Sequence, residues 1–457
     1  MTTFTAIYNK LIALLLSFFT MLGLPVGSFG NGDVDNVTAD MTIVFDDENP
    51  GTCAGNVSVE ANADGNYDIY WGDENGEKLT AEINGKTISY SEFVTVSVSA
   101  GKGEWTFNDF LTIPENAETM LLYKGDTLLE TEQLPEYKLP VYGDEMYSFG
   151  ALSDVHFNRY TDDDGSDTTE KALPQALDFL DECGVQFVGI SGDLSNNGEK
   201  ESYESFNKIV SNYDFPVYSC KGNHDCRAKY TLENWQNNIN KDVYSDNRPA
   251  NVLDVADNGL DFVYELNGDI FIFFSQISNT YYLGKQLVTD AQLDWLETQL
   301  KKYSDRTVYF FFHTFLGNDS LPTNMCEGNI INNVGAHYTL TYVKGNKDEK
   351  RLKSLLSTYK NVIFFNGHSH WSYDMQKYNI NLNISDYDGK YCTMVHVGSV
   401  GAPRTITDYS VVEKSNPGTM SEGLLLTVYN DRVLIRAVDF VSGTFLAYAT
   451  YSVDTAA

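Results

Sequence analysis

The chain is poor in cysteine and in basic residues, and both shortages limit the classes of protein to which it can belong. Its six cysteines are scattered over 457 residues without a single Cys-x-x-Cys pair, so their spacing predicts no particular disulfide. We expect Cys220 to be a free, buried residue on a central strand. Lys and Arg number 31 against 64 Asp and Glu, a formal net charge of -33. Phosphate backbones attract basic surfaces, so this balance argues against a general nucleic-acid or anionic-membrane binder.

Long apolar runs are also scarce, and the one that stands out lies at the N-terminus. Lys10 precedes an apolar run over residues 11–26, and the small residues Gly27 and Ser28 follow it. This order predicts a signal peptide over residues 1–28 and a secreted or cell-surface protein. An uncleaved N-terminal membrane anchor is the alternative. No later stretch is long and apolar enough to span a membrane.

Residues 31–140 have few helix-period runs and carry half of the net charge, with 22 acidic and 5 basic residues. Short β-rich segments alternate there with Gly, Asn and Asp clusters, which predicts an all-β sandwich domain of the immunoglobulin or fibronectin kind. The acidic clusters at 46–48 and 73–74 offer oxygen ligands for Ca²⁺, but no loop has the ligand spacing, which favours a solvated face. Residues 134–140 predict an extended, proline-stiffened linker.

Residues 146–457 change to a strand–loop–helix rhythm. Strands are predicted at 146–152, 185–190, 217–220, 307–312 and 362–365, with helices at 168–183, 199–213 and 348–359 between them. Asn267-Gly268 predicts a hairpin between two further strands, and Thr289-x-x-Gln292 predicts a capping box that opens a helix. The alternation indicates a layered α/β fold, with the β-rich C-terminal part forming a second sheet.

Side chains able to bind metal or transfer protons follow several of these strands directly. They are Asp154 and His156, Asp193, Asn223 with His224 and Asp225, His313, and finally His368 and His370. Strand ends in open α/β sheets are where sites are built. Asp-x-His and His-x-His place both side chains on one side of an extended segment, so each pair is expected to grip a metal without strain.

Imidazole and carboxylate ligands suit Mn, Fe or Zn alike, and thiolates are not needed. Seven candidate ligands are too many for one tetrahedral site, but they suit two divalent metal ions that share one carboxylate. The candidates are Asp154, His156, Asp193, Asn223, His313, His368 and His370.

In this order the motifs Asp-x-His, Gly-Asp, Gly-Asn-His-Asp, a lone His and Gly-His-Ser-His resemble those of the calcineurin-like metallophosphoesterases. The motifs cover about residues 150–370. The resemblance implies a four-layer α/β/β/α sandwich over residues 146–457, preceded here by a β-sandwich distantly like that of purple acid phosphatases. It also implies hydrolysis of phosphate mono- or diesters by a hydroxide that two metal ions activate.

The resemblance assigns roles to individual residues. Asp154, His156 and His370 would hold one metal, Asn223, His313 and His368 the other, and Asp193 would bridge them. His224 would donate a hydrogen bond or proton to the leaving oxygen, with Asp225 orienting it. A helix N-cap is the alternative role for Asp225. Asn196 stands where purple acid phosphatases carry a tyrosine ligand, which argues against an iron–tyrosinate centre.

Four basic residues near the motifs could hold a phosphate, although such residues are more often surface cations. They are Arg159, Lys221, Arg227 and Arg404. His337 and His396 are expected to be structural or surface residues. The substrate is predicted to be a phosphate-ester small molecule or polymer.

Two other functions stay open at this stage. A non-catalytic surface or binding protein with a vestigial metal site would need neither an intact ligand set nor His224. A zinc hydrolase acting on amides would need a compact His-x-x-x-His or His/Glu pattern, which the sequence does not contain. Loops at 157–168, 226–260 and 315–346 are expected to set specificity.

Overall fold

The structure is a computed structural model of the chain. It describes residues 37–107, 110–227, 231–278, 286–314, 347–377, 383–386, 389–405 and 414–455. The predicted signal peptide and the predicted insertion at 315–346, which contains Cys326 and His337, lie outside these ranges. In the described part of the chain, no helix is long and apolar enough to cross a membrane.

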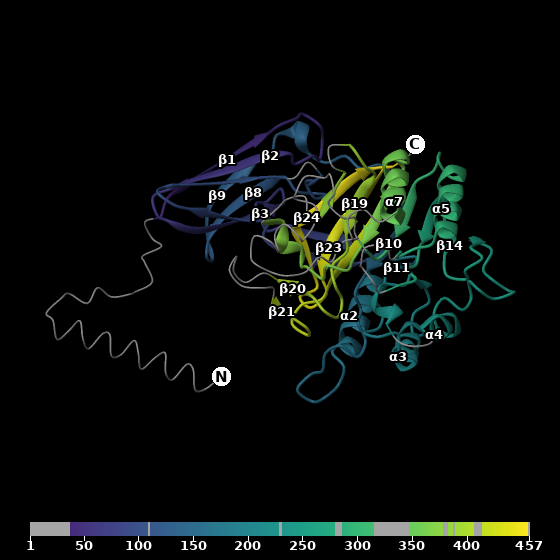
Figure 1. Cartoon of the computed structure of the whole chain (residues 1–457). Helices are drawn as coiled ribbons and strands as arrows, with labels where there is room; N and C mark the ends of the chain where they lie inside the picture. Colours follow the sequence, from purple (N-terminus) through teal and green to yellow (C-terminus); the bar gives the residue numbers. More distant parts are fainter. Residues whose placement is uncertain are drawn as a thin grey trace.

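The first region of the described chain is built from strands alone (Figure 1). One sheet has the order β1-β2-β7, a second has the order β6-β3-β8-β9, and β4 pairs with β5. Alternate side chains of these strands point into a shared core, as in β6, where Val94, Val96 and Val98 are buried. The predicted all-β region is therefore confirmed. Its strands are β1 (Ala39–Phe45), β2 (Gly55–Ala61), β3 (Gly65–Gly72), β4 (Thr80–Ile83), β5 (Lys86–Ser89), β6 (Val94–Val98), β7 (Lys102–Thr106), β8 (Thr119–Lys124) and β9 (Thr127–Gln133).

The segment after β9 is not the extended linker that the prolines predicted. It forms a 3-10 turn, η2 (Glu136–Lys138), and packs back onto the first region. The Lys138 side chain is fully buried, and its ammonium group pairs with the Asp47 carboxylate at 2.9 Å. The same ammonium group donates to the Asn49 carbonyl and the Thr52 hydroxyl. A buried cation with three partners fixes this segment in place.

The second region begins with a six-stranded sheet of order β12-β11-β10-β22-β23-β24. β10, β11 and β12 run parallel, so their carboxyl ends lie at one edge, while β22, β23 and β24 continue the sheet antiparallel. The last three strands thus extend the first sheet. The prediction that the β-rich C-terminal part forms a second sheet is wrong for these three strands, whereas the strand predicted at 392–397 does lie in the second large sheet, as β19. The strands are β10 (Glu145–Leu152), β11 (Val188–Ile190), β12 (Val217–Ser219), β22 (Glu422–Tyr429), β23 (Arg432–Asp439) and β24 (Thr444–Asp454).

The second large sheet has the order β13-β14-β15-β16-β17-β19-β18. The predicted hairpin is present: Asn267 and Gly268 both have positive φ, 52° and 99°, at the turn between β14 and β15. The strands are β13 (Val252–Val255), β14 (Phe262–Leu266), β15 (Asp269–Phe273), β16 (Val308–Phe311), β17 (Val362–Asn366), β18 (Ile384–Ser385) and β19 (Thr393–His396).

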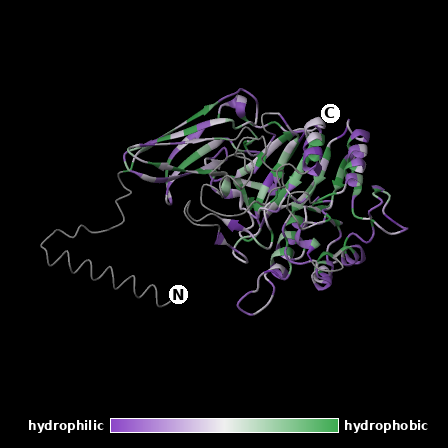
Figure 2. Ribbon diagram, in the orientation of Figure 1, coloured by the Kyte–Doolittle hydropathy of each residue, from purple (hydrophilic) through white to green (hydrophobic). Residues whose placement is uncertain are grey.

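Helices cover the outer faces of the two sheets, which gives the predicted α/β/β/α order (Figure 1). In β15, Phe271 and Phe273 face the first sheet, while Ile270 and Ile272 join the core beneath α5 and α7. This alternation appears in Figure 2 as apolar strands between helices with polar outer faces. The predicted capping box at Thr289 opens α5. The helices are α2 (Thr169–Glu182), α3 (Lys200–Val210), α4 (Thr231–Asn238), α5 (Asp290–Lys302) and α7 (Lys347–Thr358).

The edge strand β24 joins the two regions. The Ser91 amide donates to the Phe445 carbonyl, and the Thr112 amide donates to the Thr450 carbonyl. The Tyr90 and Phe445 rings pack with centroids 5.3 Å apart. The first region therefore covers the outer edge of the six-stranded sheet, which would otherwise expose unpaired backbone groups. The domain boundaries at 31–140 and 146–457 stay predictions.

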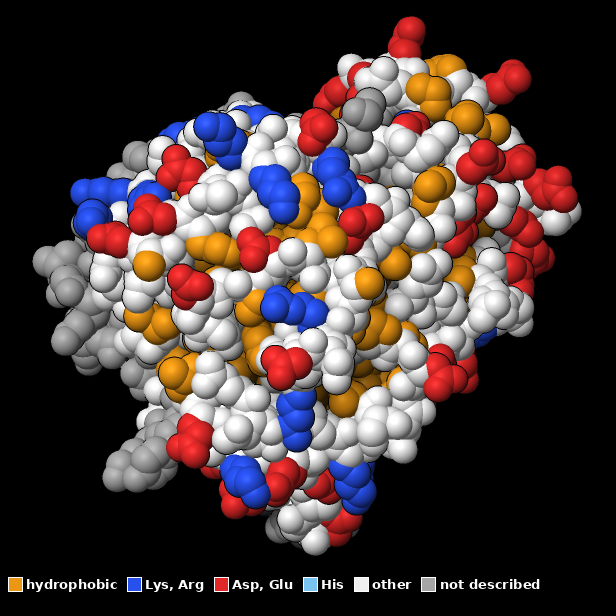
Figure 3. Space-filling view, turned by 90° about the vertical axis from the view of Figure 1, so that its right-hand side faces the viewer, with side chains coloured by type: hydrophobic (Ala, Val, Ile, Leu, Met, Phe, Trp, Pro, Cys, Tyr) orange, Lys and Arg blue, Asp and Glu red, His pale blue; other side chains and the backbone are white. Residues whose placement is uncertain are grey.

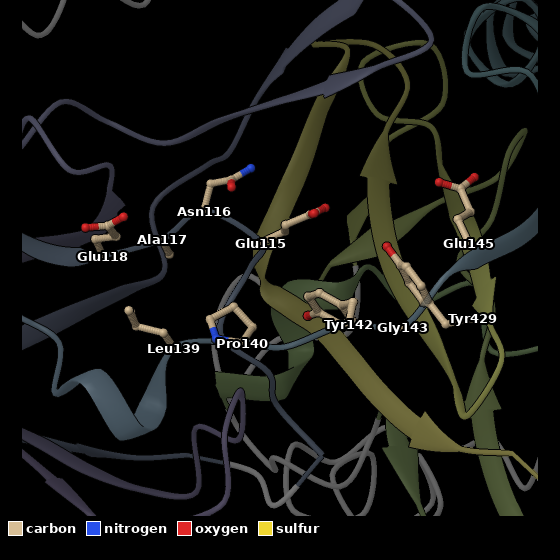
Figure 4. Close-up of a pocket in the computed structure, with 10 residues that line it drawn as sticks. All are labelled: Glu115, Asn116, Ala117, Glu118, Leu139, Pro140, Tyr142, Gly143, Glu145 and Tyr429. Carbon is tan, nitrogen blue, oxygen red and sulfur yellow. The ribbon is translucent and has the colours of Figure 1, made fainter.

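A hollow of about 400 Å³ lies where these two regions meet (Figure 4). Glu115, Glu118 and Glu145 line it together with Tyr142 and Tyr429, whose rings are stacked with centroids 5.0 Å apart. Glu145 begins β10, so the hollow lies at the end of the sheet opposite to the ends of the parallel strands.

The cysteines and the charged surface side chains of the described residues can be compared with the expectations from the composition. Cys220 is fully buried and free, as predicted, but the prediction of a central strand is wrong, because Cys220 directly follows β12, an edge strand of the six-stranded sheet. Cys53, Cys183, Cys226 and Cys392 are free as well. On the face shown in Figure 3, the blue Lys and Arg side chains are interspersed with acidic ones and do not merge into one surface, whereas red Asp and Glu side chains gather at the upper right almost without basic neighbours.

Candidate metal centre

All seven predicted ligands lie together where the parallel strands of the two sheets end. Asp154 follows β10, Asp193 follows β11, Asn223 follows β12, His313 follows β16 and His368 follows β17. Each of the seven side chains is buried. Since these strands come from two sheets packed face to face, their carboxyl ends bring distant parts of the chain to one place.

A first group is formed by Asp154, His156, Asp193 and His370, whose ligand atoms lie within 4.8 Å of one another. The Nε2 atoms of His156 and His370 are 3.1 Å apart, and Asp154 Oδ1 is 3.2 Å from His370 Nε2. Asp193 Oδ2 is 3.6 Å from His156 Nε2. Two imidazole nitrogens and two carboxylate oxygens thus point at one small volume.

A second group is formed by Asp193, His313 and His368. His313 Nε2 lies 3.1 Å from Asp193 Oδ2 and 3.1 Å from His368 Nδ1. Asn223 Oδ1 is also 3.1 Å from His313 Nε2, which adds an amide oxygen to this group. Asp193 belongs to both groups, as a bridging ligand would.

The donor set fits divalent metal ions. Asp154 Oδ1 and Asp193 Oδ2 are buried without a hydrogen bond, although a buried carboxylate oxygen without a partner is costly. Both atoms face imidazole nitrogens, and a cation between them would satisfy oxygens and nitrogens together. Oxygen and imidazole ligands of this kind suit Mn, Fe and Zn.

The backbone at the ligands differs from the extended geometry that the sequence suggested. Asp154, His156, Asp193, His368 and His370 have φ values of 50°, 57°, 55°, 74° and 63°. This left-handed region costs about 1–2 kcal/mol per residue for a side chain with a Cβ. The prediction that each pair grips a metal without strain is therefore wrong: each of the five side chains is aimed by a strained backbone.

Close backbone approach explains two glycines of the motifs. A Cβ on Gly222 would lie 2.1 Å from Asp193 Oδ1, and one on Gly367 would lie 2.4 Å from Asp154 Oδ2. Both glycines therefore leave room for a ligand carboxylate from another loop.

Carbonyl groups outside the two groups orient the ligand rings. His313 Nδ1 lies 2.9 Å from the Ser191 carbonyl oxygen, and His370 Nδ1 lies 2.9 Å from that of Ala402. A ring that donates Nδ1–H to a carbonyl presents Nε2 as a metal ligand. Asp154 Oδ2 accepts the His368 amide at 2.8 Å, which ties the first strand end to the last motif.

Burial and mutual charge govern protonation in the metal-free site. Burial and the nearby Asp193 charge raise the pKa of Asp154 to about 6. Burial opposes charge on His313, but Asp193 and Asp154 outweigh it and raise the His313 pKa to about 9. Burial and the Arg159 charge hold the pKa values of His156 and His370 well below the usual range.

His224 lies beside the first group and is not among the ligands of either group. Its ring is 4.6 Å from the His156 ring, centroid to centroid. Its Nδ1 lies 2.8 Å from the Asn196 carbonyl oxygen, which leaves Nε2 to face the site. Burial lowers the His224 pKa to about 4, and the Arg227 and Arg159 charges act in the same direction.

Asp225 does not orient His224, because no hydrogen bond joins the two side chains. The Asp225 carboxylate instead accepts hydrogen bonds from the loops that carry Asp193 and Asn223. Its donors are the amides of Leu194, Ser195 and Gly222 and the hydroxyls of Ser195 and Tyr203. It is not a helix cap either, since it lies within the 3-10 turn η3 (His224–Cys226). Asp225 is a brace between two ligand loops.

The sequence did not indicate Asn196 as the partner of His224 or Tyr203 as a partner of Asp225. Asn196 contributes its backbone carbonyl, which any residue type supplies, so no sequence signal exists for that contact. His396 is buried and lies 2.8 Å from the Trp371 carbonyl oxygen, in keeping with the structural role expected for it.

The four basic residues near the motifs differ in position. Lys221 is buried, and its ammonium group lies 5.8 Å from the Trp235 ring centroid. Arg159 Nη1 lies 3.0 Å from His156 Nε2 and so borders the first group. Arg404 and Arg227 act through charge, lowering the pKa values of His370 and His224 respectively.

A layered α/β/β/α protein with buried groups of Asp and His side chains able to bind metal has the architecture of a metallohydrolase. Residues 147–372 match the family model of the calcineurin-like phosphoesterases, and this region of the chain belongs to that family.

Two curated relatives match part of the chain. A probable glycerophosphodiester phosphodiesterase from Arcobacter nitrofigilis is 28% identical over 131 residues, which cover 28% of this chain and 40% of that protein. A glycerophosphodiester phosphodiesterase from Enterobacter lignolyticus is 30% identical over 143 residues, covering 31% of this chain and 46% of its own. The matched part of the chain thus spans less than half the length of either relative.

Among solved structures, a purple acid phosphatase from yellow lupin (Lupinus luteus) seeds is similar over 92% of this chain and 74% of its own. The sequence identity is 14%, and the TM-score is 0.42.

Proposed function

We propose that this protein is a metal-dependent phosphoesterase that hydrolyses phosphate mono- or diesters with two divalent metal ions. The observation that carries the proposal is the pair of buried ligand groups that share Asp193. The first metal would be held by Asp154, His156 and His370, and the second by Asn223, His313 and His368. Mn, Fe and Zn all suit these ligands.

Two such cations would lower the pKa of a water molecule and offset the charge that develops on phosphoryl oxygens. The chain's own residues supply orientation. Asn196 fixes the His224 ring through Nδ1–H, so that Nε2 faces the leaving oxygen, and Nε2 donates a hydrogen bond or proton to that oxygen when the ring is in its imidazolium form. Asp225 braces the loops of Asp193 and Asn223 and touches no reacting atom in this proposal.

Hydrolysis of diesters has support from the two curated relatives, both of which are named glycerophosphodiester phosphodiesterases. Export through residues 1–28 is part of the same proposal and is supported by the N-terminal sequence pattern. The other candidate is a non-catalytic binding protein with a vestigial metal site. The buried position of His224, beside the ligands and not among them, favours the enzyme.

The test combines metal content with hydrolysis of p-nitrophenyl phosphate and bis-p-nitrophenyl phosphate. The wild type should hold about two metals per chain and cleave at least one ester. Asp193→Asn should lose metal and activity, because the shared ligand is weakened. His224→Ala should keep its metal and lose about 10²–10⁴-fold in rate, the usual contribution of a general acid.

A folded wild type that binds no metal would refute the proposal. A wild type that binds two metals but cleaves neither ester would favour the binding protein. Arg351→Ala is a matched surface control, because Arg351 pairs with Asp294 and Glu297 on helices away from the site.

A further inference from the structure

Arg159 is a cationic side chain at the edge of the candidate metal centre, to which the proposed mechanism gives no role. It comes three residues after His156, in the loop that leaves the site toward α2. Its Nη1 atom lies 3.0 Å from His156 Nε2, the nitrogen that also lies 3.1 Å from His370 Nε2. The guanidinium group therefore reaches the volume that the first ligand group surrounds.

The backbone on both sides of Arg159 is held in place. The Phe157 amide donates to the Leu194 carbonyl at 3.0 Å, and the Asn158 amide donates to the Asp167 carboxylate at 2.6 Å. After Arg159, the Tyr160 carbonyl accepts the Thr168 amide. A side chain on a loop pinned in this way loses less freedom when it binds a ligand, so the position is preorganised.

In the described part of the chain, no carboxylate lies within ion-pair distance of the Arg159 guanidinium group, although acidic residues outnumber basic ones by 64 to 31. A half-buried arginine without a carboxylate beside it keeps its positive charge available, and its position beside the proposed metal ions favours an anionic ligand.

We propose that Arg159 is a specificity-determining residue that binds a terminal oxygen of the substrate phosphoryl group and makes the enzyme prefer phosphate monoesters to diesters. The inference rests on the proposed function of the same site and names its substrate class. Arg159 reaches the site from the side of His156, and the planar guanidinium fork matches phosphate oxygens.

The preference follows from the chemistry of the two esters. A monoester carries one more terminal oxygen and about one more negative charge near neutral pH than a diester, in which a second alcohol occupies that oxygen. The two ligand carboxylates, Asp154 and Asp193, offset only half of the charge that two divalent cations would bring. Arg159 is therefore not needed to neutralise ligands, and its positive charge is left for the substrate.

The experiment measures kcat/KM for p-nitrophenyl phosphate and bis-p-nitrophenyl phosphate in the full-length, metal-loaded protein. Arg159→Ala should lower kcat/KM for the monoester about 10- to 100-fold, the range expected for a charge-assisted hydrogen bond, and for the diester less than about 3-fold. Arg159→Lys should fall between, because the charge remains and the fork is lost.

Binding of inorganic phosphate, measured by calorimetric titration of the metal-loaded protein, is a readout that does not depend on turnover. Arg159→Ala should weaken it about 10- to 100-fold at unchanged metal content. Arg432→Ala is the matched control, because Arg432 begins β23 at the sheet end opposite to the site and pairs with Asp431. It removes the same charge and should change neither measurement.

An equal loss for both esters, or phosphate binding that Arg159→Ala leaves unchanged, would overturn the assignment. Failure of the proposed function can be told apart from failure of the Arg159 assignment. If the wild type cleaves neither ester but binds phosphate, the catalytic proposal fails, and the phosphate titration of Arg159→Ala still decides the role of Arg159. A wild type that binds metal but no phosphate would overturn both.

Discussion

The all-β region and the metal centre use the left-handed backbone region in different ways. In residues 37–133 the non-glycine residues with positive φ are Asn84, Ala100 and Asn116, all of them at turns. At the centre they are Asp154, His156, Asp193, His368 and His370. Asn, Asp and His all adopt this region more often than other residues with a Cβ, whereas Ala has no such preference. The turns use the left-handed backbone to reverse the chain, and the centre uses it to aim ligand atoms.

The difference shows where the fold holds unfavourable energy. In the all-β region, the buried ammonium group of Lys138 is satisfied by three partners, and Trp71 Nε1 is a buried polar atom without one. At the centre, strained backbones coincide with buried carboxylate oxygens that lack hydrogen bonds. Such strain persists only where the surroundings fix it. The hydrogen bond that Asp225 accepts from the Ser195 amide and the one that the His368 amide donates to Asp154 supply that constraint.

Of the substitutions, the one that removes the Asp225 brace between the two ligand loops is expected to change the free energy of unfolding most. Asp225→Ala should lower the free energy of unfolding by about 3 kcal/mol, because five hydrogen bonds are lost and their buried donors are left unpaired. Chemical denaturation of the metal-free protein measures it. His224→Ala is the control and should cost about 1 kcal/mol, since its ring accounts for one hydrogen bond to a carbonyl. Equal losses would show that Asp225 is no brace.

Metal binding should stabilise the protein, because a bound cation would satisfy the buried carboxylate oxygens of the metal centre that lack hydrogen bonds. At a free metal concentration of 100 times the dissociation constant, each occupied site should add about 2.7 kcal/mol to the stability. Thermal melting with and without a chelator measures the gain, and Asp193→Asn should lose most of it. A wild type that melts at one temperature under both conditions would contradict the assignment of a metal site.

Removing one buried charge should stabilise the metal-free protein. Burial raises the pKa of Asp154 from 3.8 to about 6, so its ionised form costs stability, and the cost is complete only above pH 6. Asp154→Asn should therefore gain about 1–2 kcal/mol at pH 7.5 and lose that advantage as the pH falls toward 4. Denaturation at the two pH values tests it, and a mutant less stable at pH 7.5 would show that the carboxylate is favourable without metal.

The sequence predicted local features of the structure better than contacts between segments that are distant in the chain. Continuous apolar runs located most strands of both large sheets, and Asn267-Gly268 located a hairpin, because these signals are local. The ligands could be named because each follows a strand. The partner of His224 could not, since it is a backbone carbonyl of Asn196 on another loop. The strained ligand backbones were also missed, because Asp and His do not indicate positive φ.

The last three strands, β22, β23 and β24, were assigned to the wrong sheet for a similar reason. Their apolar runs predicted strands correctly, but the choice of neighbour depends on packing between distant segments. β22 pairs with β10, more than 270 residues earlier in the chain, as in Phe149 opposite Leu426. No local pattern in either strand indicates that pairing.

The smallest expected change in stability concerns the turn residues with positive φ. Ala100 and Gly101 form the two-residue turn between β6 and β7. Ala100 has a φ of 53° there, a position at which Asn is preferred. Ala100→Asn should stabilise the protein by about 0.5–1 kcal/mol, because Asn tolerates this geometry better than Ala. Asn267→Ala, the opposite change in the Asn267-Gly268 turn, should destabilise it by a similar amount. Both are measured by thermal melting of the metal-free protein, and shifts of the same sign would show that backbone preference does not govern these turns.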